Sequence, residues 1–69
     1  MDKFIEFNNG IFNTRHIIAM TKCKRDGGPQ GPQYGIALYV TGDIERQYFD
    51  NEYKRDKVFN QVLRELLNE

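Results

Sequence analysis

Hydrophobic and polar residues alternate along several short stretches of the chain, and a period of two is typical of β-strands. The clearest stretch is YGIALYV, where Tyr34, Ile36, Leu38 and Val40 share one face and the residues between them share the other. With the shorter alternating runs included, the pattern predicts strands at residues 4–7, 11–12, 17–24, 34–40 and 44–50.

Residues that favour turns separate these strands. The NNG motif at 8–10 and the TGD motif at 41–43 are signals for tight hairpin turns, because Asn and Gly tolerate positive φ values. The NTRH segment at 13–16 interrupts the apolar pattern and predicts one irregular or 3₁₀ turn. Since each connection suits a hairpin, we expect consecutive strands to pair in a simple up-and-down order.

The last segment has a helical period. Apolar residues recur at intervals of three and four and predict one stripe along a helix over residues 52–67, namely Val58, Phe59, Val62, Leu63, Leu66 and Leu67. Asp50 or Asn51 can serve as the N-cap, and Glu52 suits the first turn. A helix of this length is not stable alone, so its stripe must be buried on the sheet.

These elements predict the fold class. We expect an α+β protein: a four- to five-stranded antiparallel β-meander followed by one C-terminal α-helix packed on one sheet face, in a single domain over residues 1–69. One helix covers only one face, and we expect Ile36 and Leu38 to lie against it. The opposite face of such a sheet is usually polar.

The strands predict an unusual second face. Both faces of the two middle strands carry apolar residues, so we expect Ala37, Tyr39 and some of Ile18, Met20 and Phe49 to lie on the open face. Such a patch usually marks an association surface. The candidate partner-binding residues are therefore Ile18, Met20, Ala37 and Tyr39. Alternatively, strong coiling of the sheet or the N-terminal hairpin covers them in a monomer.

The size of the chain favours association. A chain of 69 residues buries only about 60% of its unfolded surface, so its core is thin. Small domains compensate with disulfides, a metal ion or a partner chain. One cysteine and one histidine predict no intramolecular disulfide and no structural metal site. Oligomerisation, most simply a homodimer, is the remaining source of stability.

The charges balance, with ten Lys and Arg against ten Asp and Glu. This balance argues against coating nucleic acid by bulk electrostatics, but it permits a local basic patch. Lys22, Lys24 and Arg25 with the nearby Tyr34 predict an alternative function, in which a basic hairpin binds RNA or single-stranded DNA. A second cluster at Lys54, Arg55 and Lys57 is interleaved with acids and is typical of a solvated surface.

Residues 23–35 hold four of the six glycines and both prolines. The segment lacks the P-loop motif, and a strand rather than a helix follows its glycines. It therefore predicts a long hairpin connection, and the exposed 24–34 loop is a second place where a partner can make contact.

Catalytic chemistry has little support in the sequence. The chain has no serine, and no recognisable spacing ties His16 to Cys23 as base and nucleophile. His16 is expected to cap or pack in a turn, and Cys23 to fill space at a strand end. We expect no catalytic residue, no cofactor and no bound metal.

The stretches FIEFNNGIFNTRHIIAM and GIALYVTGDIERQYFDNEYKRDKVFNQVLREL follow an order of strands, Gly turns and C-terminal helix. This order resembles small bacterial and phage accessory proteins, of which the FlbD-type flagellar accessory proteins are the nearest. The resemblance covers most of the chain outside residues 22–33 and implies fold alone, with no catalytic residues to transfer. The long Gly/Pro loop departs from the shorter connection of that family.

The sequence thus predicts a small non-enzymatic binding or accessory protein, bacterial or phage, that acts through protein–protein contacts. Nucleic-acid binding is the alternative. No apolar run approaches the length of a membrane span, and no export signal is visible at the N-terminus. With a single free cysteine, these features predict a cytoplasmic protein.

Overall fold

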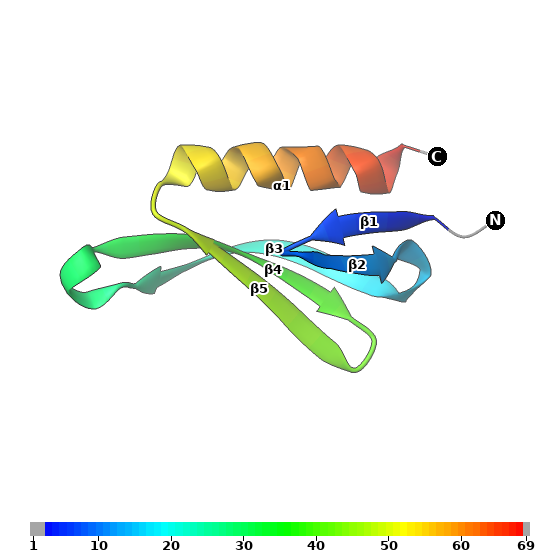
Figure 1. Ribbon diagram of the computed structural model, residues 1–69, viewed down its shortest axis with the longest axis horizontal. Coiled ribbons are helices and arrows are strands. Elements are labelled where there is room, and N and C mark those ends of the chain that lie inside the picture. Colours follow the sequence, from blue (N-terminus) through cyan, green and yellow to red (C-terminus); the bar gives the residue numbers. More distant parts are fainter. Residues whose placement is uncertain (1–2, 69) are drawn as a thin grey trace.

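The computed structural model describes residues 3–68 and confirms the α+β class. Five strands, two short 3₁₀ turns and one helix follow in chain order: β1 Phe4–Phe7, β2 Gly10–Asn13, η1 Thr14–His16, β3 Ile17–Asp26, η2 Gly28–Gln30, β4 Pro32–Val40, β5 Asp43–Phe49 and α1 Glu52–Leu67 (Figure 1). The helix bounds match the prediction, whereas β3 and β4 extend further into the Gly/Pro segment than expected. Within residues 3–68, no helix is long and apolar enough to cross a membrane.

The strands divide into two antiparallel sheets, a β1–β2 hairpin and a β3–β4–β5 sheet, rather than one continuous meander. The break falls at η1, where the Asn13 side chain accepts a hydrogen bond of 3.0 Å from the amide of Arg15. This turn redirects the chain, so that the hairpin lies on the same side of the sheet as α1 (Figure 1). Among residues 3–68, no further helix or strand lies on the other side of the β3–β4–β5 sheet (Figure 1).

The turn of the β1–β2 hairpin explains its attachment to the sheet. Asn8 and Asn9 have φ values of 51° and 65°, the left-handed conformation that a two-residue hairpin turn requires. The Asn8 side-chain amide donates a hydrogen bond of 3.1 Å to the carbonyl oxygen of Arg46 in β5. At the other end of β1, the Lys3 amino group donates to the carbonyl oxygens of Glu65 and Asn68 in α1 and its C-cap.

The core lies between α1, the hairpin and the covered side of the sheet. Ile36 and Leu38 are 0% exposed and contact Ile5, Phe7 and Val62, which confirms that these two β4 residues face the helix. Burial of two large aliphatic side chains contributes roughly 1.5–3 kcal/mol each. The stability of the fold therefore depends on a small cluster of buried side chains between β1, β4 and α1.

Two residues expected on the open face lie instead on the covered side. Met20 pairs with Leu38 and Phe49 pairs with Tyr34, and both pack against the core. Cross-strand partners share a face, so the register decides their side. In β5 that register follows from the two-residue turn that pairs Val40 with Asp43, which alternation alone does not reveal.

The apolar stripe of α1 is only partly buried. Val62 is in the core, and Val58, Phe59 and Leu66 pack against it. Leu63 and Leu67, which were expected under the sheet, are exposed. At the start of the helix, the Asn51 side chain accepts a hydrogen bond of 2.8 Å from the amide of Lys54, so Asn51 rather than Asp50 is the N-cap.

Candidate binding surfaces

A groove lined mostly by apolar residues runs between the start of β3 and the C-terminal half of α1. The groove has a volume of about 410 Å³ and is lined by Thr14, Ile17, Ile18, Ala19, Met20, Leu63, Leu66 and Leu67. Ile18 and Leu67 are 72% and 73% exposed. We call this surface the β3–α1 groove; it unites Ile18 and Met20 of the predicted partner-binding set.

A β-bulge accounts for the exposure of Ile18. The register shifts between Ile17, which pairs with Val40, and Ala19, which pairs with Tyr39, so Ile18 is an extra residue without a partner across the strand. Ile17 packs against the core and Ile18 turns away from it. Because β3 is the edge of its sheet, Ile18 protrudes at the rim of the groove.

The side of the β3–β4–β5 sheet that faces away from α1 is a second surface, which we call the uncovered face. Its residues follow from the strand register: Ala19, Thr21, Cys23 and Arg25 in β3; Gln33, Gly35, Ala37 and Tyr39 in β4; Ile44, Arg46 and Tyr48 in β5. Among these described strand residues there are two arginines and no carboxylate. The acids of β5, Asp43 and Glu45, pair with Val40 and Leu38 and lie on the other side.

Arg25 and Tyr48 form the best-defined contact on the uncovered face. The guanidinium carbon of Arg25 lies 3.7 Å from the centroid of the Tyr48 ring, and its Nε donates a hydrogen bond of 2.7 Å to the side-chain oxygen of Gln33. Gly35 makes room for this stack, because a Cβ at Gly35 would lie 2.7 Å from both the Tyr48 ring and the Sγ of Cys23. The guanidinium thus lies over an aromatic ring at cation–π distance.

The predicted partner-binding residues fall on two surfaces. Ile18 and Met20 line the β3–α1 groove, whereas Ala37 and Tyr39 belong to the uncovered face. Ala37 is only 1% exposed, so its side chain offers little area to a partner. Tyr39 is half-buried and remains accessible.

The predicted nucleic-acid-binding residues also separate. Lys22, Lys24 and Tyr34 lie on the covered side of the sheet, and Arg25 lies on the uncovered face. Lys22 pairs with Asp56 at 3.2 Å, and the amino group of Lys24 lies 5.3 Å from the centre of the Tyr34 ring. The structure therefore does not bring these four side chains into one basic surface.

Arg55 in the first turns of α1 has a role that sequence reasoning missed. Its side chain is 7% exposed and donates to the carbonyl oxygens of Cys23 and Gly35 at 3.1 and 3.3 Å. Glu52 and Asp56 supply carboxylates at 3.3 and 2.7 Å. This buried arginine fixes the start of α1 to β3 and β4. In the sequence, only the three-residue spacing of Glu52 and Arg55 indicates an ion pair. The charged residues around Arg55 are typical of a solvated surface, so its burial could not be predicted.

The environment of Asp56 follows from the same cluster. The hydrogen bond from Arg55 is the main cause that lowers the pKa of the Asp56 carboxyl, and the hydrogen bond and positive charge of Lys22 act in the same direction. Partial desolvation opposes them. The carboxylate is thus the favoured form of Asp56 in the folded protein.

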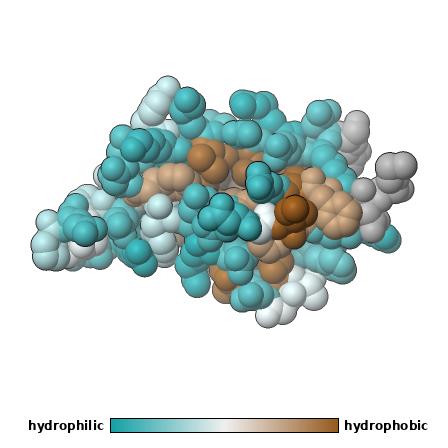
Figure 2. All heavy atoms as spheres, viewed as in Figure 1, coloured by the Kyte–Doolittle hydropathy of each residue, from teal (hydrophilic) through white to brown (hydrophobic). Residues whose placement is uncertain are grey.

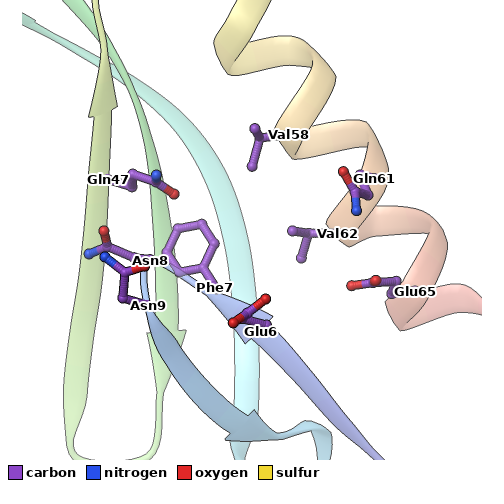
Figure 3. A pocket seen from close by; sticks show the side chains of 9 residues that line it. All are labelled: Glu6, Phe7, Asn8, Asn9, Gln47, Val58, Gln61, Val62 and Glu65. Carbon is purple, nitrogen blue, oxygen red and sulfur yellow. The ribbon is translucent and has the colours of Figure 1, made fainter.

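A small polar cleft opens between the hairpin turn, β5 and α1 (Figure 3). It has a volume of about 250 Å³ and is lined by Glu6, Phe7, Asn8, Asn9, Gln47, Val58, Gln61, Val62 and Glu65. Phe7 points toward Val58 and Val62, while amides and carboxylates form the rim (Figure 3). These nine residues offer hydrogen-bonding groups and two negative charges, but no hydroxyl, thiol or imidazole.

The Gly/Pro segment forms an ordered end to the long β3–β4 hairpin. Asp26 accepts a hydrogen bond of 3.0 Å from the amide of Gly28, and the η2 turn follows with φ values of 65° at Gly28 and 84° at Gly31. This end projects beyond the start of α1 (Figure 1). Exposed His16 lies at the opposite end of the same hairpin, where its carbonyl oxygen accepts a hydrogen bond of 2.9 Å from the amide of Thr41.

Comparison with known proteins finds no matching family model, no similar curated protein and no similar solved structure. The resemblance to FlbD-type accessory proteins stays a prediction. Inference about function therefore depends on the surfaces of this chain.

Proposed function

We propose that the protein is a small non-enzymatic binding protein that acts through protein–protein contacts, and that the β3–α1 groove joins two copies in a homodimer. The observation that carries this proposal is the exposure of Ile18 and Leu67, at 72% and 73%, on opposite sides of one apolar groove. Neighbouring exposed aliphatic side chains of this kind are typical of an association surface.

The shape of the groove supports a second copy as the occupant. Ile18 and Leu67 protrude, whereas Ile17, Met20 and Leu66 are partly buried and form the floor between them. A two-fold interface uses the same patch on both chains. Each copy can therefore place its protruding side chains over the floor of the other.

The thin core supports association for an independent reason. Among residues 3–68, only six apolar residues are buried: Ile5, Phe7, Ile36, Ala37, Leu38 and Val62. A domain of this size gains stability when a second copy covers more apolar surface. Hydrophobic side chains reach the molecular surface in a broken band between polar regions on one view of the molecule (Figure 2).

The test is sedimentation of the purified protein over a thousandfold dilution series, with Ile18→Asp as the main variant. We expect the wild-type protein to sediment as a dimer that dissociates on dilution, and Ile18→Asp to remain a monomer with an unchanged circular dichroism spectrum. A charge in the interface core must be desolvated without a partner, which disfavours the dimer.

Ile11→Asp is the matched control. Ile11 is 73% exposed, close to the value for Ile18, but it lies on the β1–β2 hairpin outside the groove. We expect this variant to dimerise like the wild type. A wild-type protein that stays monomeric at the highest concentration would contradict the proposal. An equal loss of dimer in Ile18→Asp and Ile11→Asp would contradict it as well.

A further inference from the structure

We propose that the uncovered face of the β3–β4–β5 sheet is a binding site for single-stranded nucleic acid. This proposal concerns a surface that shares only Ala19 with the β3–α1 groove, and it does not depend on dimerisation. It also differs from the basic hairpin predicted from the sequence, since of the residues named there only Arg25 takes part.

The uncovered face differs in charge from the chain as a whole. The chain as a whole is neutral, with ten basic and ten acidic residues, yet the described strand residues of the uncovered face include Arg25 and Arg46 and no acid. The β5 acids lie on the opposite side. This segregation leaves the face locally positive, which suits an anionic partner even though the net charge is zero.

Basic and aromatic side chains follow one another along the uncovered face. Successive rows of the uncovered face present Arg25, then Tyr48, then Arg46 beside Ala37, then Tyr39. Rows on one face of an antiparallel sheet are about 7 Å apart, because they are separated by two residue steps of about 3.4 Å each. The face therefore carries the stacked Arg25–Tyr48 pair at one end, Arg46 in the middle and Tyr39 at the other end, so cationic and aromatic groups are distributed along its length.

The uncovered face also presents planar side chains on which bases can stack. The guanidinium of Arg25 lies 3.7 Å from the Tyr48 ring centroid, and Gly35 leaves no Cβ beneath the stack. Guanidinium planes and aromatic rings are the platforms on which proteins stack unpaired bases. Tyr39 provides another ring in the final row. The Arg25–Tyr48 stack and Tyr39 lie on strands of a sheet whose other side packs against the core.

Stacking distinguishes the expected ligand from other anions. Bases of a single strand are free to stack on side chains, whereas bases of a duplex are already stacked on each other. An acidic peptide can neutralise Arg25 and Arg46 but has no planar bases to place on Tyr39. The combination of charge and rings thus favours the single strand.

The experiment measures fluorescence anisotropy of labelled 12-nucleotide single-stranded DNA and RNA of mixed sequence, titrated with the whole protein at low salt and again at higher salt. We expect binding that weakens as salt rises, because contacts to phosphate release counterions. Tyr39→Ala is expected to lower affinity on the order of 5- to 150-fold through lost stacking. Arg46→Gln is expected to lower affinity and to reduce the salt slope by about one unit.

Lys57→Gln is the matched control. It removes the same charge as Arg46→Gln, and its amino group lies 5.7 Å from the centre of the Tyr53 ring, but both residues lie on α1. We expect this variant to bind like the wild type. Circular dichroism verifies that all three variants are folded.

Four results would overturn the proposal. The first is absence of binding to both oligonucleotides at low salt. The second is an equal loss of affinity in Lys57→Gln and Arg46→Gln, which would indicate that binding depends on the overall charge of the protein and not on this face. The third is binding of a duplex of the same length as tightly as the single strand. The fourth is equally tight binding of poly-glutamate with no effect of Tyr39→Ala, which would indicate an acidic protein partner.

Discussion

Arg55 and Arg25 lie on opposite sides of the β3–β4–β5 sheet and meet different neighbours. On the covered side, Arg55 donates to two backbone carbonyls and two carboxylates and is almost fully buried. On the uncovered face, Arg25 is exposed, stacks on Tyr48 and bonds to an amide oxygen. Among residues 3–68, Arg25 makes no ion pair with a carboxylate.

This difference shows that the groups around an arginine determine whether its guanidinium stabilises the fold or stays accessible to a ligand. A guanidinium whose three nitrogens all donate to carboxylates or carbonyls and which is almost fully buried holds two elements together and is not accessible to a ligand. A guanidinium held by a ring and an amide keeps its charge available. Gly35 connects the two cases, because its carbonyl accepts from Arg55 on one side and its missing Cβ admits Tyr48 on the other.

The largest expected effect is that of Arg55→Met, which removes the guanidinium and keeps much of the side-chain volume. We expect a loss of about 2–3 kcal/mol in the free energy of unfolding, because hydrogen bonds to a charged donor contribute about this much. Glu52 and Asp56 reach solvent and limit the cost of losing their partner. Urea denaturation monitored by circular dichroism measures the change.

Arg25→Met is the control for this comparison. Its side chain is exposed, so we expect its free energy of unfolding to change by at most about 0.5 kcal/mol. Equal destabilisation by Arg55→Met and Arg25→Met would show that the two arginines do not differ in their contribution to stability.

An effect of similar or smaller size is expected for Gly35→Ala. The added Cβ would lie 2.7 Å from the Cys23 sulfur and the Tyr48 ring, and overpacking of this kind costs about 1–3 kcal/mol. Tyr48→Ala removes one of the two obstacles. We therefore expect the double variant to be less destabilised than the sum of the single variants, as measured by a double-mutant cycle in urea. Strict additivity would show that Tyr48 does not rest on Gly35.

The smallest effect concerns the pH dependence of stability. Because the hydrogen bond from Arg55 lowers the pKa of Asp56 in the folded state, ionised Asp56 stabilises the protein at neutral pH. This contribution is fully present above the unfolded pKa of about 3.9 and is lost as pH falls through the lowered folded pKa. Urea denaturation between neutral pH and pH 2 measures it.

Asp56→Asn provides the comparison, since it removes the titrating group. We expect this variant to lose less stability than the wild type on acidification. In Arg55→Met, the pKa of Asp56 should rise, as followed by NMR of its carboxyl carbon. An unchanged titration in that variant would show that Arg55 does not set the charge state of Asp56.

Local patterns predicted the elements well. The two asparagines before Gly10 have the positive φ values expected of the turn, and the helical period gave the bounds of α1. Site residues were harder to predict. Tyr39, Ile18 and Arg25 were named as candidates, but Arg46, Tyr48 and Leu67 were not, because their common surfaces depend on strand register and on where the helix ends relative to the sheet.

The sequence by itself determined the strands, the turns and the C-terminal helix, because alternation, turn residues and the Asn51 cap act over a few neighbouring residues. The tertiary structure alone decided three further features: the bulge that exposes Ile18, the burial of Arg55 and the separation of charges between the two faces of the sheet. The physical reason is that register and packing join residues distant in sequence. Arg55 meets the carbonyl of Cys23, 32 positions away, and no local pattern contains that contact.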